Sequence, residues 1–163
     1  MSADCIMFCI NGTPKSWKAP QFNRKTGNAY KAKQEKVWRE SVWGQAMAYA
    51  PETPWDGPVR ITLMFEFPVP KSWPKWKREW IEANPFAFPA GGPDWVNLAK
   101  ALEDALKGIF FIDDRQVAWA QIEKRYAGKD GPGVSVVLER LEGIPDKRPA
   151  REQFEGGNDD KSS

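Results

Sequence analysis

Residues 93–117 read PDWVNLAKALEDALKGIFFIDDRQV, and this stretch decides the fold of the chain. Its middle carries apolar residues at the i, i+3, i+4, i+7 spacing that places them on one face of an α-helix. They are Leu98, Ala101, Leu102, Ala105 and Leu106. Asp94 stands just before this helix and Gly108 just after it, and both residue types are typical of helix ends. We therefore predict an amphipathic helix with a buried apolar face.

Acidic residues flank the predicted helix on both sides. A short apolar run, residues 109–112, ends in two adjacent carboxylates, Asp113 and Asp114. If this segment folds back along the helix, the pair approaches Asp94, with Lys100 one or two turns away. Carboxylates gathered near a lysine are what a magnesium-dependent phosphodiesterase needs.

Each of these residues also has a purely structural interpretation. Asp94 suits a helix N-cap, where its side chain accepts hydrogen bonds from free N–H groups. Asp113 and Asp114 suit a turn before the next strand. Lys100 and Asp104 are four residues apart and suit a solvated ion pair. Only their combination in this order favours a catalytic site.

The composition excludes several kinds of chemistry. The chain has no histidine, which excludes Ser-His-Asp and Cys-His catalysis, histidine metal sites and an imidazole base. Its two cysteines, Cys5 and Cys9, cannot form a zinc site alone, and we expect buried free thiols. No apolar run reaches the length of a membrane span, and the N-terminus lacks a signal-peptide pattern. We therefore expect a cytoplasmic protein without a membrane partner, whose chemistry comes from carboxylates, lysine or a metal-bound water.

Positive charge is concentrated in two regions, residues 15–39 and 71–78. The net charge of the whole chain is only +2, but residues 142–163 hold four Lys or Arg against six Asp or Glu, so the rest carries +4. The first region mixes bases with aromatics: Lys15, Lys18, Arg24 and Lys25 with Trp17, Phe22 and Tyr30. This mixture suits a loop that follows phosphates and stacks on unpaired bases. A solvated loop whose aromatics pack onto the body is an equally good interpretation.

The remaining elements predict an α+β fold. We expect strands at residues 5–10, 59–67, 116–126 and 134–141, a long helix at 31–50 and a short one at 75–83. The glycine-rich turn at 128–133 predicts that the last two strands form a hairpin. The sum is a single domain over residues 1–141, with a mixed, mainly antiparallel sheet and two main helices on one face. Residues 142–163 are polar and charged, and we expect a disordered tail.

The motif stretch resembles the RusA-type Holliday-junction resolvases. Their hallmark is Pro-Asp-x-Asp-Asn-Leu-x-Lys at the start of a helix, then Asp-Ala-Leu along it, then Asp-Asp-x-Gln-Val after a hydrophobic run. The matching segments here are residues 93–100, 104–106 and 113–117. Upstream, Gly12-Thr13-Pro14 and Pro70-Lys71-Ser72-Trp73 also match, so the resemblance covers most of residues 5–141. One position departs from the pattern, because Val96 stands where the family has its second Asp.

The resemblance implies a magnesium-dependent endonuclease that resolves Holliday junctions and other branched DNA in recombination and repair. Asp94 and Asp114 would be Mg²⁺ ligands, Asp113 a supporting carboxylate, and Lys100 a cation that offsets phosphate charge. The DNA-binding residues would be Lys15, Lys18, Arg24, Lys25, Lys71 and Lys100. Two symmetric cuts in a four-way junction imply a homodimer. The setting would be the nucleoid of a bacterial or phage-infected cell.

Val96 leaves the efficiency of catalysis open. An aliphatic side chain offers neither the charge nor the oxygen ligand of the family Asp, so magnesium binding should weaken. The alternatives are an impaired enzyme, a junction-binding protein with a weak or inactive site, and an active enzyme altered at this position. Phe86 and Phe88, in the loop before the motif, are expected to be buried plugs, with wedges at the junction centre as the alternative.

Overall fold

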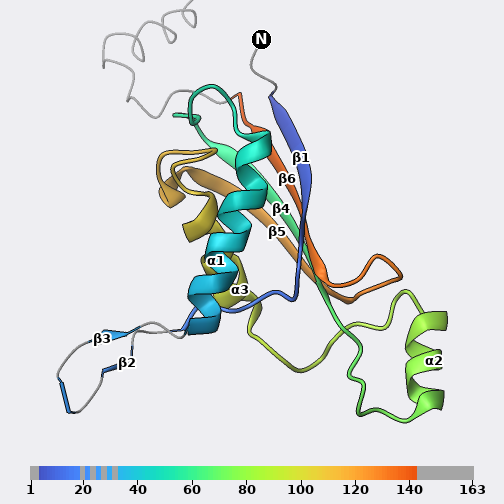
Figure 1. Cartoon of the computed structure of the whole chain (residues 1–163). Coiled ribbons are helices and arrows are strands. Elements are labelled where there is room, and N and C mark those ends of the chain that lie inside the picture. Colours follow the sequence, from blue (N-terminus) through green and yellow to red (C-terminus); the bar gives the residue numbers. More distant parts are fainter. Residues whose placement is uncertain (1–3, 19–20, 23–24, 27–28, 31–32, 143–163) are drawn as a thin grey trace, which may run out of the picture.

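The computed structural model describes residues 4–18, 21–22, 25–26, 29–30 and 33–142. Four strands form one sheet in the order β1-β6-β4-β5 (Figure 1). They are β1 (Cys5–Asn11), β4 (Val59–Phe67), β5 (Val117–Tyr126) and β6 (Gly133–Arg140). Strand β6 pairs antiparallel with β1 and β4, whereas β4 and β5 are parallel. This arrangement confirms the predicted α+β class and the mixed, mainly antiparallel sheet.

The two main helices, α1 (Lys33–Ala46) and α3 (Trp95–Leu106), lie on the same face of this sheet (Figure 1). The smaller elements are α2 (Lys75–Ala83), the single 3₁₀ turns η1 (Met47–Tyr49) and η2 (Asp114–Gln116), and the paired two-residue strands β2 (Gln21–Phe22) and β3 (Ala29–Tyr30). No helix in the described ranges combines the length and apolar character needed to cross a membrane. The expected disordered tail lies almost wholly outside the described residues.

The core forms between the helices and one face of the sheet. Strand β4 alternates strictly, so that Val59, Ile61, Leu63 and Phe65 are buried while the residues between them are half-buried on the other face. This period of two is that of a strand with one covered face. The covering residues from α3 are those of the predicted apolar stripe, and Leu98, Leu102 and Leu106 have no exposed surface. The sequence pattern therefore identified the buried face of both elements.

The predicted hairpin between the last two strands is wrong. Strand β4 lies between β5 and β6, pairing parallel with the first and antiparallel with the second. Strands two places apart in a sheet are separated by about 9.5 Å, which the six residues 127–132 easily span. A glycine-rich turn of this length is therefore compatible with both a hairpin and a connection across the end of β4. The apolar alternation of β4 favours the central position.

Two expectations of burial are also wrong. Cys5 and Cys9 are free and exposed, because they point away from Phe8 and Ile10 toward the face of the sheet opposite to α1 and α3. Phe86 and Phe88 are exposed rather than buried plugs. They follow α2, which projects from the body (Figure 1) and buries only Ile81, so no core lies within their reach.

Candidate functional site

The first turn of α3 begins at Asp94. The side chain of Asp94 is the N-cap, and its Oδ1 accepts a hydrogen bond of 2.7 Å from the backbone N–H of Val96. Asp94 therefore caps the helix, as its structural interpretation predicts. Its Oδ2 accepts no hydrogen bond from any described residue, and the side chain is exposed, so a ligand can still reach it. Val96, at half exposure, lies on the same turn.

A loop from the N-terminal part of the chain runs along this end of α3. The backbone N–H of Trp17 donates to the carbonyl of Asn97 at 2.8 Å. The ammonium group of Lys100 lies 3.9 Å from the centre of the Trp17 ring, a cation–π contact. These two contacts, one to the backbone and one to a side chain, fix residues 13–18 beside the motif helix. The basic loop and the motif lysine therefore lie side by side.

A cavity of about 690 Å³ opens between this loop, the start of α1 and the residue before Asp94. Its lining residues include Lys15, Lys18, Lys33, Glu35 and Pro93. Glu35 is only 7% exposed and accepts a long hydrogen bond, 3.4 Å, from the backbone N–H of Lys18. The positive charge predicted for DNA binding thus lines a hollow next to Asp94, with one buried carboxylate on its wall.

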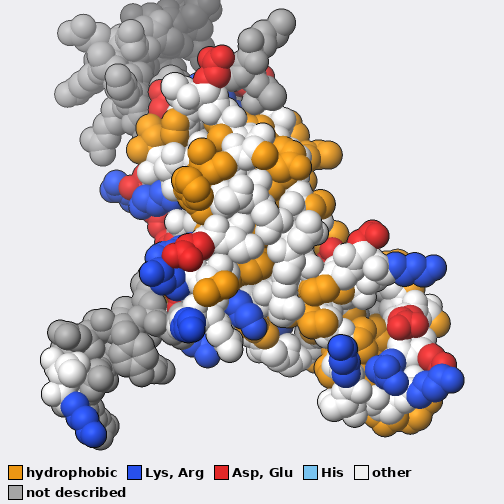
Figure 2. All heavy atoms as spheres, viewed as in Figure 1, with side chains coloured by type: hydrophobic (Ala, Val, Ile, Leu, Met, Phe, Trp, Pro, Cys, Tyr) orange, Lys and Arg blue, Asp and Glu red, His pale blue; other side chains and the backbone are white. Residues whose placement is uncertain are grey.

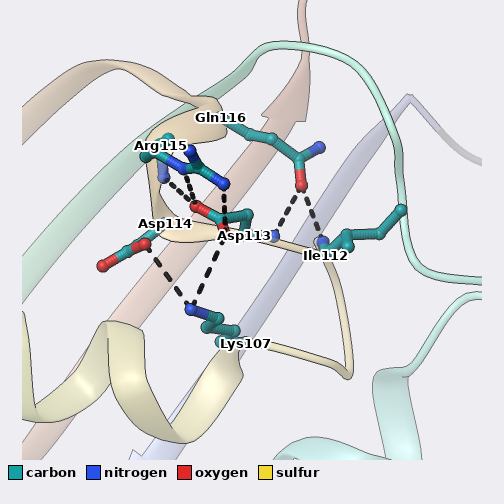
Figure 3. A network of polar contacts seen from close by, with 6 residues as sticks. All are labelled: Lys107, Ile112, Asp113, Asp114, Arg115 and Gln116. Carbon is teal, nitrogen blue, oxygen red and sulfur yellow. Dashed lines mark hydrogen bonds and ion pairs between the residues drawn. The ribbon is translucent and has the colours of Figure 1, made fainter.

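The other acidic residues lie where β5 begins (Figure 3). Asp113 caps η2, and its carboxylate accepts from the backbone N–H of Arg115 at 3.0 Å and from the guanidinium at 2.8 and 3.2 Å. These hydrogen bonds hold the pKa of Asp113 well below its usual range. The side-chain oxygen of Gln116 accepts from the N–H groups of Ile112 and Asp113, both at 2.7 Å. The amide of Gln116 donates to the carbonyls of Trp55 and Gly57, so the turn is fixed to the body of the protein.

Lys107, at the C-terminal end of α3, joins the two carboxylates (Figure 3). Its Nζ lies 3.6 Å from Asp114 Oδ1 and 3.9 Å from Asp113 Oδ2. Burial, and then the negative charge of Asp114, raise the pKa of Glu103 one turn earlier on the helix. Asp113 is already engaged by Arg115. Asp114 is the more exposed of the pair, so it is the better candidate ligand at this end.

The two groups of carboxylates are far apart within one chain. Asp94 and Lys107 flank a helix of 12 residues, which is roughly 18 Å long. Strand β5 starts beside Asp114 and returns toward the other end, where Lys124 donates to the carbonyl of Pro93 at 3.3 Å. The chain therefore folds back only after Asp113 and Asp114, which stay beside Lys107 at the C-terminal end of α3, and Asp94 does not meet them. Across the described residues, no three acidic or thiol groups are placed to hold a metal ion.

The predicted DNA-binding residues divide between several places. Lys15, Lys18 and Lys100 gather at the Asp94 end, and Lys71 is exposed just before α2. Lys25 is exposed in the turn between β2 and β3, and Arg24 lies outside the described residues. The structure thus unites three of the six predicted cations with the first motif acid.

Three further residues beside these groups were not among the predicted site residues: Glu35, Lys107 and Lys124. Lys107 directly follows the Asp-Ala-Leu segment and lies before the predicted stop at Gly108, but its pairing with Asp113 and Asp114 depends on the turn after the helix. The sequence predicts Trp17 as an aromatic of the basic loop, but not its contact with Lys100, which links residues 83 positions apart. Nothing in the local sequence distinguishes Glu35 or Lys124 from a solvated residue.

Comparison with known proteins gives two matches. The family model described as Endodeoxyribonuclease RusA matches residues 11–139, most of the chain. A protein of Bacillus subtilis (strain 168), named Uncharacterized protein YqaN, is 28% identical over 141 residues, which are 85% of this chain and 98% of that protein. The match over residues 11–139 includes both acidic groups and the basic loop from Lys15.

Proposed function

The chain belongs to the RusA endodeoxyribonuclease family, and on this premise we propose that it cuts branched DNA such as a four-way junction. The observation that carries this proposal is the arrangement at the Asp94 end. An exposed carboxylate, the motif lysine and two loop lysines lie together beside an aromatic ring. Cations bind the phosphates, and a free carboxylate oxygen is available at the place where the backbone would lie.

Each side chain at this end has a role that follows from its position. Lys15 and Lys18 line the cavity and would neutralise phosphates along the strand. Lys100 would place its ammonium against the scissile phosphate, and the Trp17 ring beneath it limits the positions it can take. Asp94 Oδ2 would hold a metal ion or a water near that phosphate. Asn97 would keep the loop in place through its carbonyl.

Magnesium does not fit the carboxylates of a single chain, because Asp94 and Asp114 lie at opposite ends of α3. Their oxygens are nevertheless the ligands that this ion prefers. We propose that the donor set is completed in a homodimer. A two-fold axis perpendicular to α3 reverses the direction of the helix, so Asp94 of one copy would face Asp114 of the second. In such a site the ion would activate water and stabilise the leaving oxygen.

Exposed apolar surface on this side of the molecule supports a second copy. Strand β5 is at the edge of the sheet, and an edge strand has free N–H and C=O groups that can pair. Trp95 is 54% exposed at one end of α3, and Ile112 is 58% exposed beyond the other end. An open hollow between α3 and β5 is lined by Trp95, Ala120, Ile122 and Lys124. Two copies paired here would cover these residues.

The test is complementation between two inactive variants. Asp94→Asn and Asp114→Asn should each abolish cleavage of a synthetic four-way junction. In a mixed dimer, one of the two shared sites has both carboxylates intact. A 1:1 mixture that exchanges freely should therefore recover about a quarter of the sites and nick the junction without paired cuts. If the mixture stays inactive while ultracentrifugation shows dimers, the site is not shared between copies.

Val96 favours a second candidate function, binding of junctions with slow cleavage. The residue is exposed at the motif helix start and supplies no charge or oxygen where the family has an acid. Tight junction binding with no nicking across a magnesium series would support this alternative. In that case the complementation test is made in the Val96→Asp background, where the missing carboxylate is restored.

A further inference from the structure

We propose that α2 and the loop after it form a surface that stacks on bases exposed at the branch point of the DNA. We name this the α2 aromatic surface and define it as Trp76, Trp80, Phe86 and Phe88. The proposal rests on the proposed function, because it assumes branched DNA as the ligand. The α2 aromatic surface would be the part of the protein that distinguishes a branch point from a continuous duplex.

Each of the four rings is more than half exposed. Trp76 and Trp80 are 69% and 56% exposed, and Phe86 and Phe88 are 79% and 52% exposed. The two tryptophans are four residues apart and so lie on the same side of α2. Monomeric proteins rarely leave large apolar side chains together in water without a partner. Figure 2 shows orange and blue side chains side by side on the part of the molecule that α2 forms.

The fold does not need these four rings. A different aromatic residue attaches this region to the sheet, since Trp73 meets Tyr126 edge to face with ring centres 5.7 Å apart. Lys77 lies 3.6 Å above the Trp73 ring, and Ile81 is the only buried side chain of α2. The inner side of α2 thus provides the attachment. Its outer side is free to contact a ligand.

The charge around the rings favours nucleic acid over protein as that ligand. Residues 71–83 contain four cations, Lys71, Lys75, Lys77 and Arg78, against two carboxylates, Glu79 and Glu82. The Lys75–Glu79 pair, at 3.6 Å, is highly exposed and contributes little. Lysine is depleted from the cores of protein–protein interfaces. Aromatic rings among cations are what single-stranded nucleic acid binds, by stacking on the rings and by pairing its phosphates.

The position of this surface relative to Asp94 indicates the branch point. The loop that carries Phe86 and Phe88 runs directly from α2 to Asp94. The ammonium group of Lys124 holds the end of this loop by donating to the carbonyls of Gly91 and Pro93, at 3.5 and 3.3 Å. In Figure 1, α2 projects on one side of the molecule and the β2–β3 pair on the other. DNA whose scissile phosphate lies at Asp94 would therefore place neighbouring bases at α2. In a continuous duplex these bases are stacked on each other, whereas at an opened branch point their faces are available.

The experiment compares Trp76→Ala/Trp80→Ala with Trp43→Ala, a matched control because Trp43 is 54% exposed on α1. Binding of the full-length protein is measured by fluorescence anisotropy without metal, to a four-way junction and to a duplex of the same sequences. The junction also carries 2-aminopurine at its centre, whose emission reports unstacking. We expect the double variant to bind the junction roughly tenfold more weakly, with duplex binding within about twofold, and to lose the 2-aminopurine change. Trp43→Ala should change neither, and Trp76→Phe/Trp80→Phe should restore most of the junction affinity.

Three results would overturn the proposal. Unchanged junction affinity and 2-aminopurine emission would show that the rings do not touch the branch point. An equal loss on junction and duplex would show a general effect on DNA binding. A change of mass in ultracentrifugation would show that the rings join two copies. If the wild-type protein itself does not prefer junctions, the proposed function fails; if it does and the double variant keeps that preference, only this inference fails.

Discussion

Replacing Val96 with Asp should restore a carboxylate to the Asp94 end with little effect on stability. Val96 is half exposed, so its replacement loses about half of the roughly 1.5 kcal/mol that a fully buried valine contributes. An acid in the first turn of α3 gains about 0.3–1 kcal/mol from the positive end of the helix. The two terms nearly cancel, and the N-cap bond from the backbone N–H of residue 96 to Asp94 is retained. We therefore expect the melting temperature to change by less than about 4 °C.

The effect on magnesium should be much larger. Asp94 and Val96 are both exposed, so we take the dielectric constant of water to estimate the attraction between a carboxylate at position 96 and a bound ion. For two unit charges 4 Å apart this attraction is at least about 1 kcal/mol. For a divalent ion the attraction is about 2 kcal/mol, which corresponds to a roughly 30-fold increase in the affinity for magnesium. The magnesium concentration for half-maximal cleavage should fall by about this factor in Val96→Asp.

The assay is cleavage of a labelled four-way junction by both proteins across a magnesium series, with junction affinity measured in parallel. Val96→Asn is the matched control, because it has the shape of Asp without the charge. An equal shift in Val96→Asp and Val96→Asn would refute the electrostatic reasoning. No shift in either, with rapid cleavage by the wild type, would show that this protein does not need the second family carboxylate.

Three further outcomes are expected. Asp94→Asn should abolish cleavage but change the melting temperature by less than about 2 °C, because Asn caps a helix about as well as Asp; a large thermal loss would make Asp94 chiefly structural. Arg115→Ala should raise the pKa of Asp113 toward the ordinary value of about 3.9, as followed by carboxyl NMR. Because the pKa of Asp113 is depressed in the wild-type fold, its interaction with Arg115 stabilises the fold at every pH above the ordinary pKa. This stabilisation is lost as the pH falls through the lowered pKa. The free energies of unfolding of the two proteins should therefore differ at neutral pH and converge in strong acid. Lys15→Ala/Lys18→Ala should weaken junction binding and reduce the slope of log affinity against log salt by roughly 0.9 for each lost phosphate contact; an unchanged slope would exclude the cavity beside Asp94 as the DNA surface.

Local patterns in the sequence were sufficient for the elements themselves. The apolar stripe of α3, the cap at Asp94 and the stop at Gly108 all occur as predicted, and Gly108 has the positive φ of 82° that favours glycine. Strand β4 has the predicted bounds, residues 59–67. Each of these features depends on residues a few positions apart, whose spacing alone decides which side chains share a face.

Which ends of these elements meet was decided only by the tertiary structure. The sequence determined the acids and lysines and their place before or after a helix or strand. It did not determine that β5 pairs parallel with β4 instead of forming a hairpin with β6. Nor did it show that Trp17 lies under Lys100 or that Asp94 and Asp114 are separated by the length of α3. The physical reason is that strand order and direction depend on backbone hydrogen bonds between distant segments, which any apolar strand can make with several partners. The choice among these partners follows from how the whole core is filled, and that choice places the two groups of carboxylates at opposite ends of one helix.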